Sequence, residues 1–92
     1  MVKKIERSLE IQNQKGLHAR ASAQLVEVVE AFEATAEVAK DGLSVSGDSI
    51  MGLLMLAASK GSIIDVTISG PDAEALAEAL ENLLAGKFGE TC

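Results

Sequence analysis

The dipeptide Asp41-Gly42 places the strongest single constraint on the fold of this chain. It divides the stretch TAEVAKDGLSVS, residues 35–46, in which apolar and polar side chains alternate on both sides of it. Aspartate and glycine tolerate the positive φ angles of a tight two-residue turn, and a two-residue period is typical of a strand with one buried face. The stretch therefore predicts a β-hairpin whose two strands are adjacent.

Two further segments have the period of a strand. Residues 5–11 place polar side chains at the even positions, and the odd positions carry Ile5, Arg7, Leu9 and Ile11. In SIIDVTIS, residues 62–69, one face carries Ile64, Val66 and Ile68. Each segment predicts a strand with one buried face.

Three segments have the period of a helix. Residues 19–31 are predicted to be helical because Leu25, Val28, Val29 and Phe32 fall on one stripe. DSIMGLLMLAAS, residues 48–59, predicts a short helix with Asp48 or Ser49 as N-cap and with more apolar surface than it can bury. GPDAEALAEALENLLAG, residues 70–86, predicts a third helix with Pro71 in its first turn and an end at Gly86.

The resulting order is βαββαβα, without a linker, repeat or low-complexity segment. Residues 1–92 are expected to form one α+β domain with two layers. One layer is a four-stranded antiparallel sheet, and the other consists of three helices that cover one face of it.

Composition excludes several classes of function. The net charge of −6, the 2% aromatic content and the absence of Trp and Tyr argue against a nucleic-acid partner, and with it against a small ferredoxin-like RNA binder. The longest run of apolar residues and glycine, residues 50–58, is too short to cross a membrane. There is no P-loop or dinucleotide-binding motif, so no cofactor is expected. Cys92 is the single cysteine, which excludes an intrachain disulfide and a cysteine metal cluster and fits a cytoplasmic protein.

The only histidine, His18, lies where the first predicted helix begins, two residues after Gly16 and two before Arg20. A helix N-terminus attracts anions through its unpaired N–H groups and its dipole. The imidazole could therefore attack a phosphoryl group while the backbone N–H groups of Ala19 and Arg20 and the Arg20 guanidinium hold its oxygens. Gly16 would let the loop fold back. From spacing alone, His18 could equally be an ordinary residue at a helix end, and Arg20 a solvated charge.

Two motifs in register resemble one known family. GLHARASAQLVEVVEAF, residues 16–32, followed by GDSIMGLLMLAASKG, residues 47–61, resembles the histidine-containing phosphocarrier (HPr) family of the phosphoenolpyruvate-dependent phosphotransferase system, including its nitrogen-related branch. Ser49 lies 31 positions after His18, which is the family separation between active histidine and regulatory serine. The similarity extends over essentially the whole chain, and the family's open-faced sandwich has the same βαββαβα order.

The resemblance implies a phosphate relay by a protein that is itself the substrate at each transfer, rather than an independent enzyme. Enzyme I would pass phosphate from phosphoenolpyruvate to the δ nitrogen of His18, which would hand it to an EIIA-type protein. An HPr kinase/phosphorylase would act on Ser49, and a monomer is the family expectation. Whether the final acceptor serves sugar transport or nitrogen or carbon regulation is left open.

The second helix would supply the docking patch for these partners. Its predicted members are Ile50, Met51, Leu54 and Met55, with Ala23 and Gln24 of the first helix as rim contacts. Leu53 and Leu56 would point inward. Apolar residues at helical spacing are more often core, but methionine suits a surface that must fit several partners. A regulatory docking module, whose binding is set by phosphorylation of His18 and Ser49, is the alternative function.

One position departs from the family pattern. Most members have proline directly after the arginine of the active loop, whereas this chain has Ala21. Alanine is a good helix former, so the helix should form with a less rigidly preset first turn.

Overall fold

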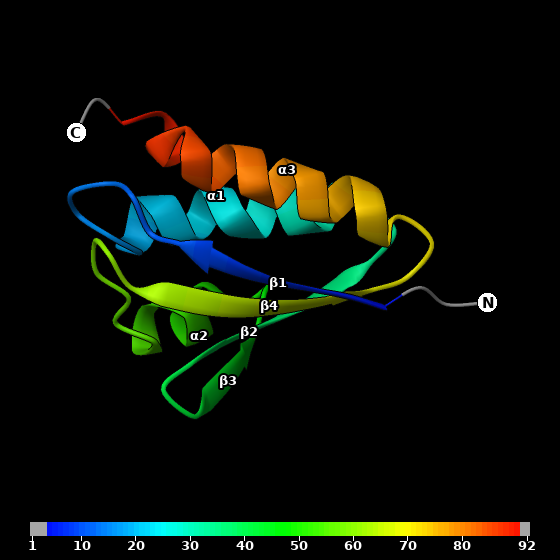
Figure 1. Cartoon of the computed structure of the whole chain (residues 1–92), viewed down its shortest axis with the longest axis horizontal. Helices are drawn as coiled ribbons and strands as arrows, with labels where there is room; N and C mark the ends of the chain where they lie inside the picture. The colour runs from blue at the N-terminus through cyan, green and yellow to red at the C-terminus, as the bar shows by residue number, and fades with distance from the viewer. Residues whose placement is uncertain (1–3, 91–92) are drawn as a thin grey trace.

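The structure, a computed structural model, describes residues 4–90 as four strands, three α-helices and one short 3-10 helix (Figure 1). Cys92 lies outside the described residues. The strands are β1 (Lys4–Glu10), β2 (Thr35–Lys40), β3 (Leu43–Ser46) and β4 (Ile63–Ser69). The helices are α1 (Ala19–Glu30), α2 (Ile50–Met55), α3 (Ala73–Ala85) and the 3-10 helix η1 (Lys87–Gly89).

The strands form one antiparallel sheet in the order β1-β4-β2-β3. The predicted hairpin is confirmed: β2 pairs with β3 around Asp41 and Gly42, which both have positive φ. Strand β4 is an inner strand of the sheet, because it pairs with β1 on one side and with β2 on the other. The predicted α+β fold, a sheet with three helices in an open-faced sandwich, is therefore confirmed.

One face of the sheet carries the core. The residues that it buries are Ile64, Val66 and Ile68 of β4 and Ala36 and Val38 of β2. They share one cluster with buried leucines of the three helices, and burying each valine, leucine or isoleucine side chain contributes about 1.5–3 kcal/mol. On the other face the polar side chains of Ser8 and Asp65 are exposed and joined by a hydrogen bond of 2.7 Å.

Arg7 breaks the apolar pattern of β1 because β1 is an edge strand. Its side chain is exposed and reaches α3, where its Nε donates to Oε1 of Glu81 at 3.0 Å. The charge of Arg7 is therefore not buried although the residue is at an odd position, and its long apolar stem can lie along the rim of the core.

The helices differ from their predicted bounds at three ends. α1 ends at Glu30, one residue earlier than predicted, and α2 is only six residues long because Ala57 adopts a left-handed φ of 51°. α3 begins at Ala73, so the prediction that Pro71 lies in its first turn is wrong. The turn before α3 extends through Asp72, whose carboxylate accepts a hydrogen bond from the Glu33 N–H at 2.8 Å.

Two connecting segments lie at the end of the molecule where α1 begins (Figure 1). The first is residues 11–18, here named the His18 loop, between β1 and α1. The second is residues 56–62, which link α2 to β4. The Leu17 N–H donates to the Ala58 carbonyl at 2.8 Å, so the two segments are joined directly. The C-terminal tail, residues 86–90, reaches the same end.

Candidate functional site

Gly16 sets the path of the His18 loop. Its φ is +67°, and a Cβ atom built there would lie 2.4 Å from the Ala58 carbonyl oxygen and 2.8 Å from the Ser59 Cα. Any other residue would therefore pay for a left-handed backbone and also clash with backbone atoms. This close approach presses the loop against residues 56–62 immediately before His18.

His18 is the N-cap residue of α1. Its backbone is extended, with φ −76° and ψ 180°, and its carbonyl accepts the first helical hydrogen bond, from the Ser22 N–H at 2.9 Å. The N–H groups of Ala19 and Arg20 precede that bond, so they belong to the set that a helix leaves unpaired at its start. Arg20 is exposed and makes no ion pair or hydrogen bond with residues 4–90. Its guanidinium is thus available to an incoming anion.

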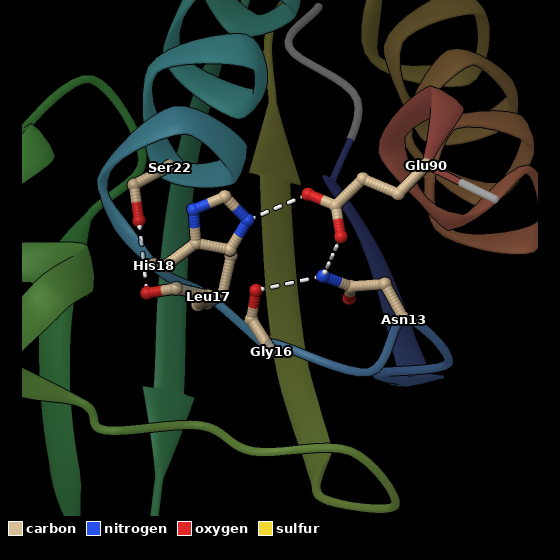
Figure 2. A network of polar contacts seen from close by, with 6 residues as sticks. All are labelled: Asn13, Gly16, Leu17, His18, Ser22 and Glu90. Atoms are coloured by element: carbon tan, nitrogen blue, oxygen red, sulfur yellow. Dashed lines mark hydrogen bonds and ion pairs between the residues drawn. The ribbon is translucent and has the colours of Figure 1, made fainter. Parts of the chain in front are cut away.

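The imidazole of His18 contacts the C-terminal tail (Figure 2). Its Nε2 lies 2.6 Å from Oε2 of Glu90, and the two side chains are 27% and 15% exposed. The other carboxylate oxygen, Oε1, accepts a hydrogen bond of 3.0 Å from the amide nitrogen of Asn13, which is buried. The Nδ1 atom lies on the side of the ring away from Glu90 and makes no hydrogen bond within residues 4–90.

Sequence reasoning missed Glu90 and Asn13. Glu90 is 72 positions from His18 and Asn13 is 77 positions from Glu90. Asn13 carries a weak signal, because a polar residue in the loop before a candidate site deserves inspection. Glu90 carries none, since nothing in the local pattern brings the tail to the start of α1.

The contact with His18 lowers the pKa of Glu90 from its usual 4.5, and the hydrogen bond from Asn13 lowers it further. Because the folded pKa is the lower one, the stability that this contact contributes is complete above about pH 4.5 and is lost as the pH falls through the folded value. We expect the side-chain carboxyl carbon of Glu90 to titrate by NMR with a midpoint below 4.5. A midpoint at or above that value would show that the tail does not hold this contact in solution.

The second helix has an exposed apolar face beside α1. Met51 and Met55 are 71% and 67% exposed, and Ile50 and Leu54 are also exposed. Leu53 and Leu56 are buried, as the resemblance implied. On α1, which packs against α2, Ala23 and Gln24 are half-buried.

Ser49 is the N-cap of α2. Its Oγ accepts a hydrogen bond from the Gly52 N–H at 3.0 Å, which confirms the capping role predicted from the sequence. Gly52 is needed here because a Cβ atom would lie 2.9 Å from Cβ of Val45.

Comparison with known proteins decides the family. The family model described as the PTS HPr component phosphorylation site matches residues 5–86. The chain belongs to the HPr family. The phosphocarrier protein HPr of Neisseria meningitidis is 43% identical over 86 residues, which cover 94% of this chain and 97% of that protein.

One further relative and one solved structure are also similar to this chain. The phosphocarrier protein NPr of Shewanella violacea is 37% identical over 87 residues, covering 95% of this chain and 96% of that protein. The crystal structure of HPr-C-His from Thermoanaerobacter tengcongensis has a TM-score of 0.91 and 38% identity, covering 96% of this chain and 99% of that one.

Membership of the HPr family assigns this chain a phosphocarrier role in the bacterial phosphotransferase system. The family works with partners of that system, such as enzyme I and EIIA proteins. Within residues 4–90, no helix is long and apolar enough to span a bilayer, and no group of three or more potential ligand side chains is placed to hold a metal ion.

Proposed function

We propose that this HPr protein accepts a phosphoryl group on His18 from enzyme I and passes it to an EIIA-type protein. The observation that carries the proposal is the position of the imidazole at the N-cap of α1, next to the unpaired N–H groups of Ala19 and Arg20. The helix dipole and the Arg20 guanidinium would stabilise the phosphoryl oxygens there. The carrier is proposed to work in the cytoplasm as a monomer, so that the exposed face of α2 is free to dock each partner in turn.

The proposal is tested by intact-protein mass spectrometry after incubation with phosphoenolpyruvate, magnesium and a purified enzyme I. The expected result is a gain of one phosphoryl group that is lost on acid treatment, with the modified peptide containing His18. No gain with a cognate enzyme I would contradict the donor step. The docking module, set by phosphorylation of Ser49, would then be the better account.

Replacing Arg20 by alanine is expected to slow phosphoryl acceptance by about 10²- to 10³-fold, as for the loss of one donor that stabilises transition-state charge. Stability should not change, because Arg20 is exposed and contacts no charged partner within residues 4–90. Quenched-flow transfer from phosphorylated enzyme I measures the rate. Arg20→Lys should be intermediate, since lysine keeps the charge but loses the planar fork.

The matched control for Arg20 is Lys4→Ala, which removes an exposed cation at the start of β1, the opposite end of that strand from the His18 loop. If Lys4→Ala slows transfer as much as Arg20→Ala, the effect comes from net charge. Arg20 would then have no particular role at the site.

Ser49 is proposed as the regulatory phosphorylation site, acted on by an HPr kinase/phosphorylase. Phosphorylation would add about −1.5 to −2 charge at the end of the exposed α2 face, close to the acidic side chain of Asp48. We expect Ser49→Asp to slow transfer from enzyme I several-fold, because the added charge and its hydration oppose docking of an apolar surface.

The control for Ser49 is Ser49→Asn. Aspartate and asparagine cap helices about equally well, so the two variants keep the cap and differ only in charge. Transfer to Ser49→Asp that is as fast as transfer to wild type and to Ser49→Asn would rule out this mode of regulation.

A further inference from the structure

Helix α2 ends at a residue whose backbone is strained. Ala57 directly follows the C-cap residue Leu56 and has a left-handed φ of 51°. For an L-residue this conformation is about 5- to 30-fold less favourable than the right-handed one, so glycine usually occupies the position after a C-cap. Ala57 is exposed, and its methyl group therefore gains little from packing that would offset the strain.

Local preference would continue the helix instead of ending it. Residues 57–59 are Ala-Ala-Ser, and alanine is the best helix former, in agreement with the helix that the sequence predicts over residues 48–59. The observed end is also only partly capped. The Ala57 N–H donates to the Leu54 carbonyl at 3.1 Å, but no hydrogen bond joins the Ala58 N–H to the Leu53 carbonyl, as a complete cap would require. The helix itself does not hold Ala57 in the left-handed state.

A contact with the His18 loop holds Ala57 in this state. The Leu17 N–H donates to the Ala58 carbonyl at 2.8 Å, and Ala58 is 4% exposed and belongs to the core. In a helix that continued through Ala57, the Ala58 carbonyl would point along the helix axis and away from the Leu17 N–H. The left-handed conformation of Ala57 and the bond between Leu17 and Ala58 therefore form and break together.

The two conformations of Ala57 have different consequences for the site. Leu17 immediately precedes His18, and Met55, the last residue of α2, belongs to its exposed apolar face. With Ala57 left-handed, this face and His18 are fixed relative to each other. With Ala57 right-handed, α2 would be longer, the Leu17 N–H would lose its partner and the His18 loop would be released. A partner that contacts both places would bind the left-handed state more tightly.

We propose that Ala57 is a conformational switch between the exposed face of α2 and the His18 loop, and that a docking partner selects its left-handed state. The role in docking rests on the proposed function, whereas the two states themselves do not depend on any partner. If only the left-handed state docks, the apparent affinity falls with the fraction of molecules in that state, and the transfer step within the complex is unchanged.

The first readout of the test is native-state hydrogen exchange of the Leu17 amide, which reports the opening of its bond to Ala58. Glycine adopts positive φ without steric cost and is a poorer helix former than alanine, so Ala57→Gly should slow this exchange by about 5- to 30-fold. Ala57→Val should accelerate it, because a β-branched residue is strongly disfavoured at positive φ. The position is exposed, so neither substitution changes the core.

The matched control is Asp41→Gly in the β2-β3 hairpin. Asp41 is exposed and has a φ of 50°, nearly that of Ala57. It takes no part in the contact between residues 56–62 and the His18 loop. The control therefore changes a similar backbone conformation elsewhere, and it should leave exchange of the Leu17 amide unchanged.

The second readout is steady-state phosphoryl acceptance from enzyme I. Ala57→Val should raise the KM for this protein several-fold and leave kcat within about twofold of wild type, because a saturating donor draws every molecule into the left-handed state. A residue that only held the imidazole in place would change kcat instead. Ala57→Gly should leave both constants unchanged, and the backbone NMR spectrum checks that each variant is folded.

The two readouts separate this inference from the proposed function. Leu17 exchange that Ala57→Gly does not slow, or that Asp41→Gly slows equally, would overturn the switch even if phosphorylation proceeds. Exchange that responds to Ala57→Val while KM stays constant would overturn its role in docking. A wild type that enzyme I never phosphorylates, with Leu17 exchange still dependent on residue 57, would contradict the proposed function and still support the switch.

Discussion

Replacing His18 by alanine is expected to abolish acid-labile phosphorylation by enzyme I. The reason is chemical: within residues 4–90 no second imidazole exists, and the exposed hydroxyl groups would form acid-stable esters. The fold should survive, because among the described residues the His18 side chain is hydrogen-bonded to Glu90 alone, and the N-cap of α1 uses no side-chain bond. Intact mass before and after acid treatment measures the result.

The His18→Ala experiment has two informative failures. An acid-labile phosphoryl group on the variant would mean that another side chain is the acceptor. An acid-stable group would indicate phosphorylation of a serine, and peptide mapping would show whether it is Ser49. Either result would require a different account of the site.

Replacing Gly16 by alanine is expected to destabilise the fold by about 2–4 kcal/mol, from a strained left-handed backbone together with overpacking. The added Cβ atom would lie 2.4 Å from the Ala58 carbonyl oxygen, and its nearest neighbours are all backbone atoms of Ala58 and Ser59, so no flexible side chain can move away. Since the loop must shift to relieve the clash, His18 should be displaced as well. A displacement of about 1 Å can cost 10²-fold in rate, so phosphorylation should slow strongly. Chemical denaturation and the transfer assay measure the two effects.

The matched control for Gly16 is Gly42→Ala in the β2-β3 hairpin. Gly42 also has a positive φ, +84°, but a Cβ atom there would meet nothing within 4 Å. The control is therefore destabilised only by its backbone conformation and should leave transfer unchanged. If both variants lose the same stability, the close approach of Gly16 to Ala58 does not contribute.

Local sequence patterns were sufficient for most of the fold. The two-residue period, the Asp41-Gly42 turn and the helical stripes are each determined by neighbours within a few positions, and all four strands and three α-helices follow them. One error lies at an end that a distant residue determines. Pro71 precedes α3 instead of starting it, because Asp72 is bound to the Glu33 backbone 39 positions away.

An exposed apolar face was predicted for the helix within residues 48–59 from the same patterns, because a short helix with almost no polar residue cannot bury every side. Which side is exposed came from the resemblance and not from the pattern, and the structure agrees with it. Leu53 and Leu56 enter the core, and Met51 and Met55 stay in solvent. That choice depends on how α2 packs on α1 and β3, which the periodicity of so short a segment does not specify.

By itself, the sequence determined the elements of the fold, the position of His18 at a helix N-terminus and the family to which the chain is similar, because these depend on residue type and short-range spacing. The tertiary structure alone decided that Glu90 meets the imidazole and that Asn13 meets the Glu90 carboxylate. Their meeting requires the sheet order β1-β4-β2-β3, the packing of α3 and the burial of Phe88. These are long-range contacts whose energy is realised only when the whole chain is folded, so no local pattern of residues encodes them.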